Sequence, residues 1–157
     1  MLGLQLYDSD GKVRELNTLS RLEPATIAQD ANARVAMLED SSWRVRNKAL
    51  AMLGKLEPTT LALHASAVVS RLEDSRESVR AKALTTLGKL DPATLAQHAF
   101  AVVMRLKDSD GAVRQMAYHT LEMLPRYVRY TTLGVDCKEL LSRALDHNEN
   151  EAEELRS

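Results

Sequence analysis

Apolar residues follow a helical period through most of the chain, in segments of two alternating kinds. At about 100° per residue, Val45, Ala49, Leu53 and Leu56 fall within one arc of roughly 80°, and polar residues cluster on the opposite arc. The same pattern recurs one period later. It predicts a helix over about 76–90.

A second kind of helix precedes each of these and starts at a proline. Pro58 and Pro92 suit the first helical turn, where a missing N–H costs no hydrogen bond, and the acid before each proline can cap the helix. Such helices are predicted from Pro58 to Leu72 and from Pro92 to Leu106. The link Glu-Asp-Ser after Leu72 ends the helix, and its acid or serine can cap the next one.

The pattern is a repeat of 34 residues. Between 37–70 and 71–104, 22 of the 34 aligned positions carry the same residue. A fixed period of this size is typical of solenoids, in which each unit buries its apolar face only against its neighbours. We therefore expect an array over 1–133, a capping helix at 134–147 and an acidic tail at 148–157 that is frayed. The array is divided into a half-unit at about 1–22, units at about 23–56, 57–90 and 91–124, and a connecting segment at 125–133.

Each unit also carries an Asp that stands five residues before a Val-Arg pair. Arg46 falls near the apolar side of its helix, where an unpaired charge is costly. The recurring Asp of a neighbouring turn is the obvious partner. The ladder expected from this pattern consists of Asp8, Arg14, Asp40, Arg46, Asp74, Arg80, Asp108 and Arg114.

The pattern D-x4-V-R, followed by Ala and Leu at helical spacing and preceded by a helix ending in Arg-Leu, resembles the HEAT repeat. It is closest to the short HEAT-like class also found in phycobilin lyases, and the resemblance covers about residues 6–124. It implies an all-α fold, a right-handed α-solenoid (superhelix) of stacked antiparallel helix pairs. The second helix of each pair would line a concave face, and an Asp/Arg ladder would run between repeats.

Composition argues against several classes of protein but identifies no specific function. The 21 Lys and Arg residues balance 22 Asp and Glu residues, so the chain has no overall basic bias toward nucleic acid. The single cysteine, Cys137, excludes an internal disulfide framework and a Cys-x-x-Cys metal pair. No signal-peptide pattern and no run of about 20 apolar residues is present. We expect a soluble, cytoplasmic protein that does not bind membranes.

The expected concave positions hold the candidate binding residues. Four lysines form a basic patch on the middle units, and Met and His replace them toward the C-terminal end. The patch suits an acidic peptide or a phosphate backbone, although lysines also keep an exposed helix soluble. No aromatic residue interleaves the lysines, which argues against single-stranded nucleic acid. The candidates are Arg44, Lys48, Lys55, Lys82, Lys89, Trp43 and His119.

Other polar candidates favour structural roles. Trp43 can be an exposed hot spot or can pack against the adjacent turn. His64 and His98 occupy equivalent places in successive units, and Asp30 occupies this place one unit before His64. A row of these three residues can bind metal or form hydrogen bonds between repeats. Cys137 fits a buried, inert thiol. No catalytic fingerprint occurs, so we expect no catalytic residue, cofactor or bound metal.

The sequence favours a non-catalytic scaffold that binds a protein or acidic peptide on its concave face. Two alternatives remain: a bilin lyase or isomerase, implied by the family resemblance alone, and a nucleic-acid-binding protein. The acidic tail can also fold back on the lysines, and the apolar start, Leu2, Leu4 and Leu6, can drive self-association. The identity of the partner, the oligomeric state and the pathway are beyond the sequence.

Overall fold

The computed structural model describes residues 11–14 and 30–133, and the regular elements it places there are all helical. The all-α prediction is confirmed for this part of the chain. Several expectations fall on residues outside it: the capping helix at 134–147, the tail at 148–157, Leu2, Leu4, Leu6, Asp8 and Cys137.

The helices follow one another in the order that the repeat predicts. The first described unit contains α3 (Ala31–Ala36), η1 (Met37–Glu39) and α4 (Trp43–Leu53). The next contains α5 (Pro58–Ala62), α6 (Ala65–Ser70), η2 (Arg71–Glu73) and α7 (Glu77–Leu87). The third contains α8 (Pro92–Gln97), α9 (Ala99–Met104), η3 (Arg105–Lys107) and α10 (Gly111–Glu122), and α11 (Arg126–Leu133) follows it.

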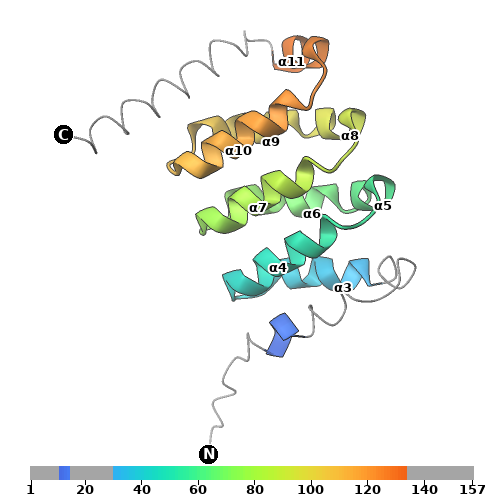
Figure 1. Ribbon diagram of the computed structural model, residues 1–157, viewed down its shortest axis with the longest axis vertical. Coiled ribbons are helices and arrows are strands. Elements are labelled where there is room, and N and C mark those ends of the chain that lie inside the picture. The colour runs from blue at the N-terminus through green and yellow to red at the C-terminus, as the bar shows by residue number, and fades with distance from the viewer. Residues whose placement is uncertain (1–10, 15–29, 134–157) are drawn as a thin grey trace, which may run out of the picture.

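The units stack one above another along the long axis of the molecule (Figure 1). Helices α4, α7 and α10 form one layer, in which α7 packs against both of the others. Helices α3, α6 and α9 form the second layer behind it. Helix α7 is therefore held between its counterparts in the two neighbouring units.

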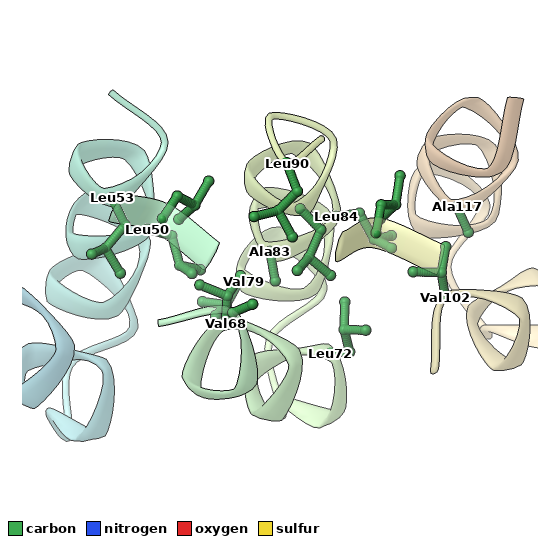
Figure 2. Close-up of a cluster of buried hydrophobic side chains, with 14 of the residues drawn as sticks. Leu50, Leu53, Val68, Leu72, Val79, Ala83, Leu84, Leu90, Val102 and Ala117 are labelled. Carbon is green, nitrogen blue, oxygen red and sulfur yellow. The ribbon is translucent and has the colours of Figure 1, made fainter. Parts of the chain in front are cut away.

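The core is continuous through the stack, both within the units and across the boundaries between them. Figure 2 shows Ala83 and Leu84 of α7 between side chains that belong to the units on either side. Val79, Ala83 and Leu84 are 0% exposed, as is Leu50 of α4. The core residues are mostly Leu, Ala and Val, whose small volumes allow helices to approach closely.

The predicted first helix is interrupted in both complete units. We expected one helix from Pro58 to Leu72, but α5 ends at Ala62 and α6 begins only at Ala65. His64 stands at the break with φ −114° and ψ 7°, and His98 has nearly the same angles, φ −110° and ψ 6°. Hydrogen bonds of the tighter i to i−3 type bridge the break, from the His64 N–H to the Leu61 carbonyl at 2.9 Å.

The structural period also extends further than the sequence identity does. We expected 125–133 to be a connecting segment, but residues 126–133 form α11. Arg126 lies 34 residues after Pro92, where α8 begins, and α11 packs against α9. Figure 1 shows α5, α8 and α11 on the same side of the stack. This segment therefore occupies the place of a further first helix.

A buried arginine lies within the largely apolar core. Arg34 is 1% exposed and lies at the position that Val68 and Val102 occupy in the next two units. Its Nε and Nη2 atoms find no hydrogen-bond partner among the described residues. Burial lowers the pKa of the Arg34 guanidinium, and the charge of Asp30 offsets only part of this effect. The position therefore costs stability that a valine would not.

We expect Arg34→Val to raise the free energy of unfolding by about 1–3 kcal/mol, because it removes buried polar atoms that have no hydrogen-bond partner in the described part of the chain. Urea denaturation followed by circular dichroism measures the change. Val68→Arg is the reverse variant and should destabilise the fold strongly. A loss of stability in Arg34→Val would show that the guanidinium makes favourable contacts at this position.

Candidate functional site

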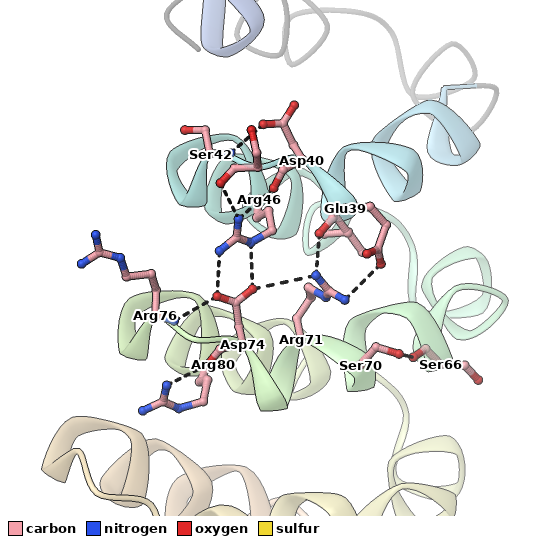
Figure 3. A network of polar contacts seen from close by, with 12 residues as sticks. Glu39, Asp40, Ser42, Arg46, Ser66, Ser70, Arg71, Asp74, Arg76 and Arg80 are labelled. Atoms are coloured by element: carbon pink, nitrogen blue, oxygen red, sulfur yellow. Dashed lines mark hydrogen bonds and ion pairs between the residues drawn. The ribbon is translucent and has the colours of Figure 1, made fainter. Parts of the chain in front are cut away.

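Arginine–aspartate pairs cross each boundary between the described units. Arg46 of α4 donates from Nε and Nη2 to the two carboxylate oxygens of Asp74, at 2.8 and 2.9 Å. Its Nη1 donates to the Asp40 carbonyl of its own unit at 2.8 Å. Both side chains are almost fully buried, and Figure 3 shows the guanidinium between the two turns. One arginine thus fixes the turn of its own unit against that of the next.

The next boundary repeats this geometry. Arg80 donates to both oxygens of Asp108, at 2.9 and 2.8 Å, and to the Asp74 carbonyl at 2.8 Å. Arg114 donates to the Asp108 carbonyl at 2.8 Å in the same way. At the N-terminal end of the described ladder, Asp40 accepts a hydrogen bond from Lys12 at 2.8 Å.

A second set of arginines crosses the boundaries in the opposite direction. Arg71 donates to the Leu38 carbonyl at 2.8 Å and pairs with Glu39 at 3.0 Å, both in the preceding unit. Arg105 donates to the Leu72 carbonyl at 2.9 Å. In the sequence, the recurring Arg-Leu indicates only the end of a helix. Its 34-residue period was a signal that these arginines have a repeated role, but the pattern gave no partner for them.

Two ladder carboxylates, those of Asp74 and Asp108, have lowered pKa values. Burial alone would raise the pKa of Asp74, but the hydrogen bonds from Arg46 and the Arg76 N–H, with the charges of Arg46 and Arg71, bring it below its ordinary value. The pKa of Asp108 is lowered against its burial in the same way, chiefly by Arg80. The hydrogen bond to Asp74 raises the pKa of Arg46.

We expect Asp74→Asn to lower the free energy of unfolding at neutral pH by about 3–5 kcal/mol, because Arg46 is left buried without its charged partner. The unfolded chain has an Asp pKa of about 3.9. Since the folded pKa is lower, the unfolded state binds more protons between the two values. The stabilisation by Asp74 is therefore complete above about pH 4 and is lost as the pH falls through the folded-state pKa.

Urea denaturation at a series of pH values measures this dependence. Asp74→Asn should lose less stability on acidification than the unmodified protein does. Glu57→Gln removes an exposed carboxylate and should follow the unmodified protein. An acid dependence of Asp74→Asn equal to that of the unmodified protein would contradict the assignment.

The candidate cations recur at helical spacing on one side of the second helices, away from the buried residues, and we call this side the second-helix face. Arg44, Lys55 and Lys89 are exposed, and Lys48 and Lys82 are half-buried. These five cations come from α4, α7 and the turns that end them. Over residues 43–56 and 77–90 the sequence holds a single acidic residue, Glu77.

Toward α10 the second-helix face becomes less basic. His119 is exposed and lies 3.4 Å from the Glu122 carboxylate, and its ring meets Tyr118 edge-on with centroids 5.6 Å apart. Met123 is 56% exposed. A Cβ atom at Gly88 would come within 3.2 Å of the Met123 sulfur, so this side chain reaches back to the end of α7. His119 is therefore engaged within its own helix.

Trp43 is half-buried and packs against the core at the start of α4. The guanidinium carbon of Arg44 lies 5.3 Å from the ring centroid, and that of Arg76 in the next unit lies 5.8 Å away. The indole thus packs at the boundary between two turns, and two cations accompany it. Of the two possibilities open from the sequence, the structure shows packing against the adjacent turn.

Asp30, His64 and His98 do share one structural place, since each directly precedes α3, α6 or α9. Within residues 11–14 and 30–133, no group of three His, Cys, Asp or Glu side chains is arranged to hold a metal ion.

None of the described helices has both the length and the apolar character that crossing a bilayer requires.

Comparison with known families agrees with this architecture. Residues 43–90, which contain α4, α5, α6 and α7, match the family model of the HEAT-like repeat. The resemblance drawn from the sequence is confirmed for these residues. No curated protein matches the chain.

Proposed function

We propose that this chain, whose central repeats are HEAT-like, is a non-catalytic scaffold that holds an acidic protein or peptide on its second-helix face. One observation carries the proposal: α4, α7 and the turns that end them place five cations on the second-helix face, besides Arg46 and Arg80 of the ladder, and residues 43–56 and 77–90 hold a single carboxylate. Such a field attracts an acidic partner and opposes a basic one.

The stacking of the units supports an extended contact. In this proposal the helix pairs continue as a right-handed α-solenoid, and the second-helix face is its concave side. Successive second helices then offer equivalent positions at regular intervals to a partner that runs across them. The ladder pairs keep these intervals fixed, because each joins one unit to the next through two charge-assisted hydrogen bonds.

The second-helix face would offer a partner charged contacts at one end and apolar contacts at the other. The α4 and α7 end offers cations, whereas the α10 end offers Met116, half-buried, and Met123, largely exposed. Methionine side chains adapt to apolar partners of different shapes. A partner with acidic residues followed by an apolar segment would therefore suit this face in one orientation.

Reversing all four lysines of the face, Lys48→Glu, Lys55→Glu, Lys82→Glu and Lys89→Glu, should abolish capture of acidic partners. The reason is the loss of attraction and its replacement by repulsion over two neighbouring helices. Affinity capture from an extract of the source cells, compared quantitatively between the variant and the unmodified protein, measures the effect.

The control is Lys107→Glu with Arg126→Glu, which reverses two exposed cations outside the second-helix face. It should capture the same proteins as the unmodified chain. Circular dichroism must show equal helix content in all three proteins. If the four-lysine variant retains every partner, the face is not the binding surface.

A further inference from the structure

Two arginines from different units meet at the single tryptophan of the chain. Arg44 belongs to α4 and Arg76 directly precedes α7, and both guanidinium carbons lie within 5.8 Å of the Trp43 ring centroid. We call Trp43, Arg44 and Arg76 the Arg–Trp–Arg cluster. Cations at this distance are attracted to the indole, and the half-buried ring keeps both near one point at the α4–α7 boundary.

These two guanidiniums differ from those of the ladder. Both side chains are exposed, and no carboxylate of the described residues forms an ion pair with either one. Arg46, Arg71, Arg80 and Arg105 by contrast all pair with acids. Figure 3 shows the Arg76 side chain extending away from Asp74. Arg76 donates to the Asp74 carboxylate through its backbone N–H, not through its guanidinium. Two positive charges thus lie beside the same indole, and neither forms an ion pair with a carboxylate in the described part of the chain.

The two helix starts at this boundary differ in their acids. No acid stands in the first turn of α4, and the Ser42 side chain makes no hydrogen bond to that turn. Arg76 stands at the corresponding position before α7, whose first turn contains Glu77. Asp110 precedes α10 and caps it, accepting a hydrogen bond from the Val113 N–H at 3.0 Å. The start of α4, which carries Arg44, therefore lacks a compensating acid in its first turn.

The next boundary supplies an internal comparison. One period later, Glu77 takes the place of Trp43, Ser78 that of Arg44 and Asp110 that of Arg76. Both boundaries have the same Arg–Asp ladder pair and equivalent buried Val and Ala residues in their second helices. The cluster is therefore not needed to build a boundary, and its chemistry belongs to the α4–α7 boundary alone.

We propose that the Arg–Trp–Arg cluster binds the phosphoryl group of a phosphorylated serine or threonine on a partner protein. Guanidinium groups bind phosphate oxygens in pairs, and two of them match the charge of about −2 that a phosphorylated side chain carries. A carboxylate offers half of that charge. The inference rests on the proposed function, since the peptide around the phosphoryl group would continue along Lys48 and Lys55 of the second-helix face.

A protein fits this surface better than a nucleic acid does. Proteins that bind single strands present successive aromatic side chains for the bases to stack on. Here one indole lies at the boundary, it is partly buried, and two cations already contact it. A phosphorylated side chain needs the cations but no exposed ring.

The experiment uses two matched libraries of short Glu- and Gly-rich peptides, one with a central phosphoserine and the other with serine. We expect the full chain to retain the phosphorylated library at least about tenfold more strongly, as two additional charge-assisted contacts imply. Arg44→Gln with Arg76→Gln should abolish the difference. Arg44→Lys with Arg76→Lys, which keeps the charge but loses the paired donors, should abolish most of it.

Because Trp43 is the only tryptophan, its fluorescence reports binding at the cluster without a label. Phosphorylated peptide should change the emission at lower concentration than serine peptide, inorganic phosphate or a single-stranded oligonucleotide. An equal response to phosphate alone or to the oligonucleotide would overturn the assignment to a protein partner. Equal retention of the two libraries would overturn the phosphoryl site.

Lys55→Gln with Lys89→Gln separates this inference from the proposed function. It should weaken binding of both libraries and leave the preference for phosphoserine intact. One outcome is that the lysine changes weaken retention of both libraries while the arginine changes leave the ratio of phosphoserine to serine retention unaltered. In that case the second-helix face binds acidic peptides but the Arg–Trp–Arg cluster does not bind the phosphoryl group. If the lysine changes alter neither library, the proposed function itself fails.

Discussion

No helix among the described residues is long enough to be stable in water alone, and the neighbouring unit supplies the missing stability. The longest, α10, has 12 residues, and α4 and α7 have 11 each, whereas isolated helices below about 12–15 residues are marginal. Helix α7 buries Val79, Ala83 and Leu84 completely between its neighbours. Because burial of this kind needs a unit on each side, stability is shared along the stack.

Apolar burial alone leaves the relative placement of two helices adjustable, and the polar contacts at the boundary remove that freedom. Arg46 reaches forward to Asp74, and Arg71 reaches back to the Leu38 carbonyl. Inside the stack, the Thr86 hydroxyl donates to the Leu50 carbonyl of the previous unit at 3.1 Å, and Thr120 repeats this with Leu84 at 3.3 Å. A shift of one unit against the next would break all of these together. The second-helix face therefore has a fixed spacing of charges.

The sequence predicts the fold where the repeat itself carries the information. Equal spacing of Asp and Val-Arg indicated which residues would meet, and Arg46 lies against Asp74. The break before His64 was missed because Leu63 and His64 are both compatible with a helix, so no glycine or proline marked it. Helix α11 was missed because its sequence no longer resembles the earlier units, although its start keeps the 34-residue spacing. The pattern within one unit could not predict contacts between side chains of different units, such as that of Arg76 with Trp43.

The positions where the units differ are the ones that can carry a specific function. The core and the ladder must repeat, since each boundary needs the same burial and the same ion pair. The surface is free of that constraint, and there the α4–α7 boundary has Trp43, Arg44 and Arg76 while the following one has two acids and a serine. At these three positions the two boundaries therefore carry opposite charges. If the second-helix face binds an acidic partner as proposed, the partner would be attracted to these positions at the first boundary and repelled at the second, which would set its place and its direction along the stack.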